Sequence, residues 1–212
     1  MIDTQLKRRV RTALLMLPLA LSAGGAAAQD SETETAVFAG GCFWCVEAAF
    51  DPIDGVVDHT AGYAGGHVEN PSYDAVTGGG TGHKEVVRVT YDPEEVTYKR
   101  LLYVFWRNVD PLDDGGQFCD RGPSYKTAIF VGGPEQRAAA KASKQALADS
   151  GRFDQPIVTP ITDLDQFYPA EGYHQDYFQE KPFRYKFYTQ GCGRYDRLDA
   201  VWGEEARPGQ DK

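Results

Sequence analysis

The chemistry that this sequence could perform centres on Cys42, which follows Gly40–Gly41 and opens a Cys-Phe-Trp-Cys segment that ends at Cys45. A short strand, a glycine turn and an amphipathic helix are expected here, which places Cys42 at a helix N-terminus. Unpaired N–H groups and the helix dipole favour a thiolate there, and such positions lower thiol pKa values from about 8.5 to between roughly 3.5 and 7.5. We therefore predict that Cys42 is a nucleophile at neutral pH.

The spacing of Cys42 and Cys45 allows three interpretations. A structural zinc site needs four ligands, but there is no second CxxC and the four histidines show no ligand spacing, so we expect neither a metal nor a cofactor. A thioredoxin-like dithiol/disulfide exchanger would use both cysteines. Alternatively, Cys42 attacks another substrate and Cys45 is a resolving or bystander thiol. The spacing leaves the last two interpretations open.

The composition is that of an ordinary globular protein. Of the 212 residues, 42% are hydrophobic and 25% are charged, which suits one domain with its own core. Four cysteines are too few for a disulfide-rich scaffold, so the fold should not depend on them. The net charge of −9 argues against a nucleic-acid partner, because binding to phosphates needs clustered Lys and Arg.

Residues 1–28 have the pattern of a secretory signal peptide. A basic run that begins at Lys7 precedes an apolar stretch from Thr12 to Ala23 and three alanines that end at Ala28. Cleavage before Gln29 would remove four basic residues and one acidic residue, and would leave a periplasmic or secreted protein with a net charge of −12. No later segment approaches the roughly 20 apolar residues of a membrane span, so we expect no membrane contact after cleavage.

The remaining sequence alternates strand patterns with helix patterns. Two-residue alternation and flanking turn residues predict strands at Thr35–Ala39, Val56–Tyr63, Glu85–Tyr91, Tyr125–Val131 and Pro156–Ile161. Three- and four-residue apolar spacing predicts helices that begin near Cys42, near Tyr98 and at Pro134. The glycine-rich stretch that ends at Gly82 is expected to be mostly loop.

These elements favour an α+β fold, a two-layer α/β sandwich with a ferredoxin-like core and a mixed or antiparallel sheet. Periodicity leaves the strand order open. We expect residues 29–212 to form one catalytic domain, and we expect its C-terminal part, from about residue 163, to be a long irregular tail that carries a cysteine at position 192.

The sequence resembles the peptide methionine sulfoxide reductase A family in an ordered series of motifs. They run from about residue 36 to residue 192, over nearly all of the expected mature chain. The matching segments are Gly41-Cys42-Phe43-Trp44, Gly62-Tyr63-Ala64-Gly65-Gly66, Asn70-Pro71-Ser72-Tyr73, Thr81-Gly82-His83-Lys84-Glu85-Val86-Val87, Tyr91-Asp92-Pro93, Phe105-Trp106, Asp110-Pro111, Asp120-Arg121-Gly122 with Tyr125, and Ala170-Glu171-Gly172-Tyr173-His174-Gln175. A single motif would be weak, but this many in order is specific.

The resemblance implies reduction of the S epimer of methionine sulfoxide, free or in proteins, with Cys42 as the nucleophile. Glu85 matches the acid that protonates the sulfoxide oxygen, which requires an apolar setting to raise its pKa. The remaining matches are Tyr63 and Tyr125 as donors to that oxygen, Asp120 as the site aspartate, and Phe43 with Trp44 as the methyl pocket.

Attack by Cys42 would leave a sulfenic acid, which a second thiol must reduce. The resemblance implies that Cys192, flanked by Gly191 and Gly193, is the recycling cysteine. Cys45 is the competitor, and Cys119 could join a relay or simply pack. An intramolecular disulfide formed in this way would need an exported thioredoxin-like electron donor.

Overall fold

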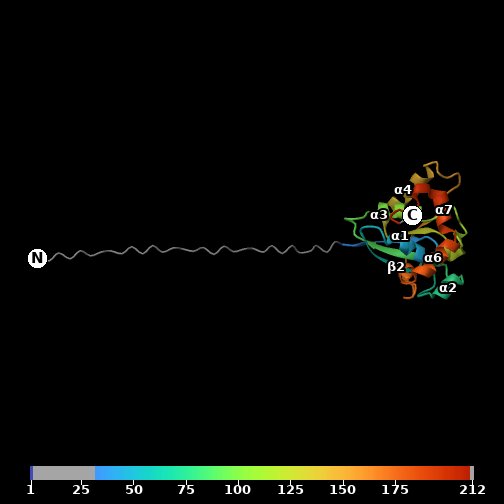
Figure 1. Ribbon diagram of the computed structural model, residues 1–212, viewed down its shortest axis with the longest axis horizontal. Helices are drawn as coiled ribbons and strands as arrows, with labels where there is room; N and C mark the ends of the chain where they lie inside the picture. The colour runs from blue at the N-terminus through green and yellow to red at the C-terminus, as the bar shows by residue number, and fades with distance from the viewer. Residues whose placement is uncertain (2–31, 211–212) are drawn as a thin grey trace. The chain divides into compact units, whose positions relative to one another are not determined.

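A six-stranded mixed sheet lies at the centre of the fold in the computed structural model (Figure 1). The structure describes residue 1 and residues 32–210, so the predicted signal peptide lies, apart from its first residue, outside the described residues. The strands are β1 (Glu34–Ala39), β2 (Val56–Ala64), β3 (Lys84–Tyr91), β6 (Ala128–Val131), β7 (Ile161–Asp163) and β8 (Phe167–Pro169). Their order is β7-β6-β1-β3-β2-β8, and β6 with β7 is the one parallel pair among them. A separate two-stranded ribbon pairs β4 (Gly116–Gln117) with β5 (Asp120–Arg121).

Helices cover one face of this sheet. The α-helices are α1 (Phe43–Phe50), α2 (Tyr73–Thr77), α3 (Tyr98–Arg107), α4 (Pro134–Ala148), α5 (Tyr177–Glu180), α6 (Pro182–Gly191) and α7 (Arg194–Trp202). Short 3₁₀ turns occupy η1 (Pro123–Tyr125) and η2 (Gly203–Glu205). None of the helices within residues 32–210 combines the length and the apolar character needed to cross a bilayer.

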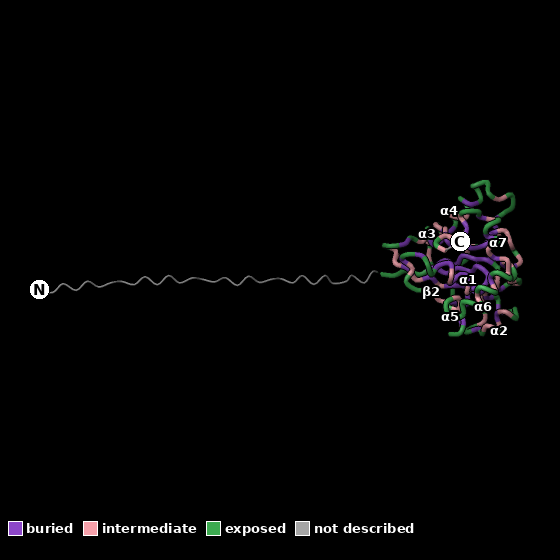
Figure 2. Tube along the Cα trace, in the orientation of Figure 1, coloured by how far each residue is buried: buried purple, intermediate pink, exposed green. Residues whose placement is uncertain are grey.

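The main core forms between that helical layer and the sheet. Phe38 of β1 stacks on Phe50 of α1 and on Phe105 of α3, with ring centroids 5.2 and 5.1 Å apart. The alternate residues of β1 point to the opposite face, where Val37 joins a smaller cluster with Phe130 of β6. Figure 2 shows the buried segments gathered around α1 and the sheet, with exposed loops at the periphery. Two layers with one dominant core confirm the predicted sandwich.

Six elements of the sheet and of its helical layer have the ferredoxin-like arrangement. The chain order β1-α1-β2-β3-α3-β6 builds the strand order β6-β1-β3-β2, in which all neighbours are antiparallel. Strand β3 therefore lies between β1 and β2, the split form of the βαβ unit. This confirms the predicted ferredoxin-like core and supplies the strand order that periodicity left open.

The predicted strand at Pro156–Ile161 begins later than expected. Strand β7 covers Ile161–Asp163, because proline at 156 and 160 has no backbone N–H to donate to a ladder. Only the carbonyl of Pro160 joins the sheet edge, where it accepts from the backbone N–H of Ile129 at 3.0 Å.

The expected irregular tail instead contains β8 and three helices, α5 to α7. Helix α6 has no one-sided apolar pattern, since Phe183 and Phe187 are 89% and 81% exposed. Helix α7 is held by contacts that are distant in sequence, such as the hydrogen bond from Trp202 Nε1 to the carbonyl of Val109 at 2.8 Å. The structure of the tail therefore depends on tertiary contacts that local periodicity does not report.

Candidate active site

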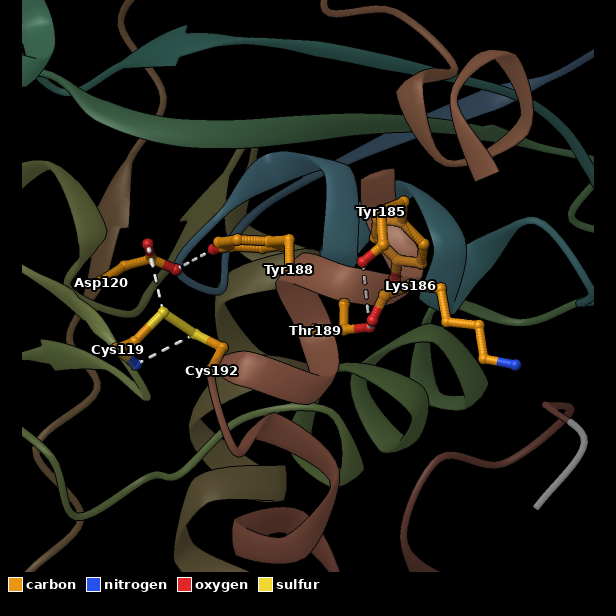
Figure 3. The surroundings of a disulfide bond; sticks show 7 residues. All are labelled: Cys119, Asp120, Tyr185, Lys186, Tyr188, Thr189 and Cys192. Atoms are coloured by element: carbon orange, nitrogen blue, oxygen red, sulfur yellow. Dashed lines mark hydrogen bonds between the residues drawn. A yellow bond between two sulfur atoms is a disulfide. The ribbon is translucent and has the colours of Figure 1, made fainter. Parts of the chain in front are cut away.

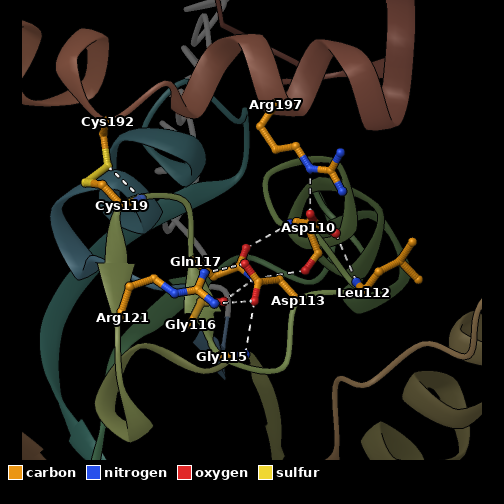
Figure 4. A network of polar contacts seen from close by, with 10 residues as sticks. All are labelled: Asp110, Leu112, Asp113, Gly115, Gly116, Gln117, Cys119, Arg121, Cys192 and Arg197. Atoms are coloured by element: carbon orange, nitrogen blue, oxygen red, sulfur yellow. Dashed lines mark hydrogen bonds and ion pairs between the residues drawn. A yellow bond between two sulfur atoms is a disulfide. The ribbon is translucent and has the colours of Figure 1, made fainter.

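The N-terminus of α1 is packed against the loop that carries β4 and β5, and this contact positions Cys42 as the N-cap residue of α1. Gly41 has φ +86°, and a Cβ there would lie 2.6 Å from Cβ of Gln117. Gln117 is itself fixed by buried hydrogen bonds with the backbone of Asp110, whose carboxylate accepts from Arg197 of α7 (Figure 4). Glycine is therefore required at position 41 to bring the two segments together.

A cavity of about 260 Å³ opens at this helix end. Its lining residues are Cys42, Phe43, Trp44, Tyr73, Glu85, Asp120, Tyr125 and Tyr188. Six of these were predicted from the sequence as site residues, and they come from α1, β3, β5 and η1. The fold thus brings together side chains that are more than 80 residues apart in the sequence. Among the predicted residues, Tyr63, Cys45 and Cys192 do not line it.

Glu85 is buried at the start of β3, with 2% of its surface exposed. Its Oε2 accepts a hydrogen bond from the backbone N–H of Phe43 at 3.0 Å. Burial raises the pKa of this carboxyl to about 8, although the Phe43 hydrogen bond opposes the shift. Glu85 therefore holds a proton near neutral pH, as an acid in this position must.

The two thiols of α1 are both buried and share a hydrogen bond. Burial raises the pKa of Cys42 well above its usual value, and the neighbouring Cys45 adds to the rise. The hydrogen bond from Cys42 lowers the pKa of Cys45 to about 7, and the positive charge of Arg194 acts in the same direction.

The sequence-based expectation of a lowered pKa at Cys42 is therefore corrected. The helix N-terminus supplies no hydrogen bond to the Cys42 side chain, and the first N–H of the helix, that of Phe43, is taken by Glu85. Burial of both thiols also disfavours the dithiol exchanger, because a folded protein partner could not reach either sulfur directly.

Of the two tyrosines predicted as donors, Tyr125 lines the cavity and Tyr63 does not. Tyr63 is fully buried and its hydroxyl donates to Oε2 of Glu171 at 2.8 Å. The cavity instead receives Tyr73 and Tyr125, whose hydroxyls hydrogen-bond each other. Burial raises the pKa of Tyr73 to about 12 and that of Tyr125 further, so both hydroxyls keep their protons. Tyr73 belongs to the Asn-Pro-Ser-Tyr motif of the resemblance, a signal that could have identified it.

An aromatic wall closes one side of the cavity. Trp44 stacks on Tyr177 of α5 with centroids 3.8 Å apart, and its Nε1 donates to Nδ1 of His174 at 3.2 Å. Tyr188 of α6 meets the indole edge-on at 5.9 Å, and the ring of Phe43 lies 5.0 Å from that of His174. The C-terminal segment that was expected to be irregular therefore builds part of the site.

A disulfide joins Cys119 and Cys192, which are 73 residues apart in sequence (Figure 3). Asp120, next to Cys119, accepts a hydrogen bond from the hydroxyl of Tyr188, which lies one helical turn before Cys192. Burial raises the pKa of Asp120. The disulfide thus lies beside two residues of the cavity. It also shows that Cys119 pairs with Cys192, whereas the sequence left open whether Cys119 joins a relay or simply packs.

Comparison with known proteins agrees with this geometry. The family model described as peptide methionine sulfoxide reductase matches residues 34–206. The peptide methionine sulfoxide reductase MsrA of Bacillus licheniformis is 49% identical over 172 residues, which cover 81% of this chain and 95% of that protein.

Two solved structures extend the likeness to the fold. Mxr1 from Saccharomyces cerevisiae in reduced form has a TM-score of 0.67 at 30% identity and covers 72% of this chain and 88% of that chain. Methionine sulfoxide reductase A of Corynebacterium diphtheriae has a TM-score of 0.64 at 34% identity, with 73% and 77% covered. The chain therefore belongs to the peptide methionine sulfoxide reductase family.

Proposed function

We propose that this protein reduces methionine S-sulfoxide, free or in proteins, to methionine, with Cys42 as the nucleophile. The observation that carries the proposal is the convergence of Cys42, a protonated Glu85 and two phenols on one cavity with an aromatic wall. Membership of the reductase family supports the same activity. A thiol attacks a sulfoxide sulfur effectively only when the oxygen is protonated or strongly hydrogen-bonded, and Glu85 is the group that supplies the proton.

The reductive step transfers one oxygen from substrate to enzyme. While Glu85 protonates the sulfoxide oxygen, the Cys42 sulfur attacks the sulfoxide sulfur and forms a transient S–S bond. The hydroxyl then transfers to the Cys42 sulfur as this S–S bond and the S–O bond to methionine break, which releases the thioether and leaves a sulfenic acid on Cys42. Cys45 shares a hydrogen bond with the Cys42 thiol, so its thiolate can accept the proton that Cys42 loses.

Tyr73 and Tyr125 are the donors that we assign to the sulfoxide oxygen as negative charge develops on it. This assignment replaces Tyr63, whose hydroxyl is engaged by Glu171. Phe43 and Trp44 supply the apolar wall against which the substrate methyl group packs.

Recycling of Cys42 is proposed to end in the Cys119–Cys192 disulfide. The Cys192 thiolate attacks the Cys42 sulfenic acid and releases water, which forms a Cys42–Cys192 disulfide. The Cys119 thiolate then attacks the Cys192 sulfur, which frees Cys42 and leaves the disulfide seen here. Since Cys119 is exposed while Cys42 is buried, this disulfide is the one that a thioredoxin-like donor can reach. Cys45 is the alternative resolving thiol.

Replacement of Cys42 tests the proposed function directly. The Cys42→Ser protein is expected to lose reduction of a methionine S-sulfoxide substrate even with excess dithiothreitol, because no sulfur remains to take the oxygen. The Cys45→Ser protein, which removes the buried thiol assigned to accept the Cys42 proton, should still form methionine in the first turnover, at a lower rate. Methionine formation in one turnover is measured by chromatography, with disulfide exchange assayed in parallel. Sulfoxide reduction that survives in Cys42→Ser would refute the proposal.

Replacement of Glu85 tests the proton donor. The Glu85→Gln protein should show a reductive step slower by roughly 10²–10⁴-fold, the usual contribution of a positioned acid. In the parent protein the acid form exists below the pKa of about 8, so the rate should fall as pH rises through 8. That decline should be absent in Glu85→Gln. The matched control is Glu94→Gln at an exposed carboxylate, and equal rates in the two variants would exclude the assignment.

Replacement of Cys192 tests the recycling route. The Cys192→Ser protein should complete one turnover but lose steady cycling with a thioredoxin-like donor. The Cys119→Ser protein should accumulate a Cys42–Cys192 disulfide, which peptide mapping by mass spectrometry identifies. Cycling that persists in Cys192→Ser and vanishes in Cys45→Ser would transfer the recycling role to Cys45.

We propose a periplasmic or secreted location, supported by the leader pattern of residues 1–28. Expression of the full chain in a Gram-negative bacterium should yield a protein in the periplasmic or culture fraction whose N-terminus is Gln29. Intact-mass measurement and N-terminal sequencing check this. A protein that keeps residues 1–28 and fractionates with the cytoplasm would contradict the location without affecting the reductase activity.

A further inference from the structure

A second cluster of titratable side chains lies outside the cavity and takes no part in the reaction proposed above. Glu47 comes from α1, His59 from β2, and Asp176 is the residue before α5. One donor atom from each lies within 4.8 Å of the others. The three residues come from distant parts of the sequence, so the absence of a ligand spacing among the histidines could not reveal this cluster.

The polar atoms of this cluster are incompletely paired. The side chain of His59 is 10% exposed, and its Nδ1 has no hydrogen-bond partner within the described part of the chain. Nδ1 faces Oε1 of Glu47 at 3.7 Å and Oδ1 of Asp176 at 3.6 Å, both beyond the about 2.7–3.2 Å of an N–H···O hydrogen bond. Glu47 is fully buried, and its Oε2 is also unpaired within residues 32–210. Buried polar groups without partners are costly.

The other nitrogen of His59 is held as in a metal-binding histidine. Nε2 lies 3.3 Å from Oδ1 of Asp51, the residue that ends α1, and the same oxygen accepts from Nε2 of Gln179 at 2.9 Å. A carboxylate that accepts from one ring nitrogen fixes the tautomer in which the other nitrogen offers its lone pair. In that tautomer of neutral His59 the lone pair is on Nδ1, the nitrogen that faces the carboxylates of Glu47 and Asp176.

We propose that Glu47, His59 and Asp176 bind a divalent transition-metal ion, for which Zn²⁺ is the best match. Tetrahedral bonds of about 2.0–2.2 Å separate ligand atoms by about 3.3–3.6 Å. The observed separations of 3.6 and 3.7 Å from His59 Nδ1 are close to that range. Two carboxylates balance the charge of the ion, and an imidazole ligand favours zinc over calcium or magnesium, which prefer oxygen.

Such an ion would connect three segments that support the aromatic wall of the cavity. Glu47 lies on the helix that also carries Trp44, and its Oε1 accepts from the backbone N–H of Asp176 at 3.4 Å. Asp176 directly precedes Tyr177, on which Trp44 stacks. Binding should therefore stabilise the fold at this wall, and it does not depend on the reductase chemistry.

A proton on His59 is the competing occupant. Burial lowers the pKa of His59, but the nearby carboxylates of Glu47, Asp51 and Asp176 outweigh it and raise the pKa to about 9. A histidinium among three carboxylates would account for the charges without any metal. Direct titration separates the two cases, because only the metal site takes up an ion with defined stoichiometry.

Titration with Co²⁺ and Zn²⁺ tests the proposal on the full-length chain with its Cys119–Cys192 disulfide closed. A Cys42→Ser/Cys45→Ser variant removes both free thiols as alternative ligands. Both proteins should bind one equivalent of Co²⁺ with visible d–d bands and no thiolate-to-cobalt charge-transfer band. Zn²⁺ should displace the Co²⁺ and raise the melting temperature of both proteins. Absence of one-to-one binding would show that a histidinium occupies the cluster and would overturn the proposal.

Substitutions identify the ligands. The His59→Gln protein should lose the cobalt spectrum and the melting-temperature rise. The Asp51→Ala protein should bind about 10–100-fold more weakly, the usual effect of removing the partner of a metal-binding histidine. Its control is Asp58→Ala, at the exposed residue next to His59, which should bind as the parent does.

Two results would overturn the assignment of residues. Unchanged binding in His59→Gln, or loss of binding in the thiol-free variant, would place the ion elsewhere. Should His59→Gln fail to fold, equal affinities in Asp51→Ala and Asp58→Ala would overturn the site on their own.

Discussion

The hydrogen bond between the backbone N–H of Phe43 and Oε2 of Glu85 is the contact on which the site depends. It joins the first turn of the helix that presents Cys42 to the start of the central strand β3. The N–H of Phe43 is therefore engaged by Glu85, and the Cys42 side chain accepts no hydrogen bond from the helix N-terminus. The helix end therefore positions the acid rather than activating the sulfur, and burial keeps that acid protonated.

Burial imposes opposite demands on the two reacting groups. The apolar setting that retains a proton on Glu85 also raises the pKa of Cys42. Cys45 offers a resolution, because its hydrogen bond with Cys42 lets the pair share one negative charge that the positive charge of Arg194 favours. A second buried thiol can thus serve deprotonation of the first without ever forming a disulfide with it.

Local patterns in the sequence were sufficient to predict the elements that have one apolar face in the main core. Strand β1 has close to its predicted limits, and helices α1 and α3 begin close to their predicted starts, because their apolar residues repeat regularly. The C-terminal helices were missed, since exposed Phe183 and Phe187 interrupt any one-sided pattern and the anchoring contacts are long-range. Motifs in the sequence identified Cys42 and Glu85. They could not identify the disulfide partner of Cys192, because Cys119 lies 73 residues away in the sequence. Tyr73 was missed because it lies on a helix within a segment that was expected to be a glycine-rich loop.

The position of the disulfide explains how a buried nucleophile can be served by a protein reductant. Asp120 and Tyr188 line the cavity. Asp120 follows Cys119 in the sequence, and Tyr188 lies one helical turn before Cys192. Cys42 is buried at the cavity, while Cys119 is exposed. In the proposed recycling route, oxidising equivalents leave the cavity through this disulfide, so electrons can be exchanged at the surface although the Cys42 sulfur is buried. Helix α6, which sequence patterns missed, therefore contributes to both the cavity and the disulfide, because Tyr188 lines the cavity and Cys192 lies at the C-terminal end of the same helix.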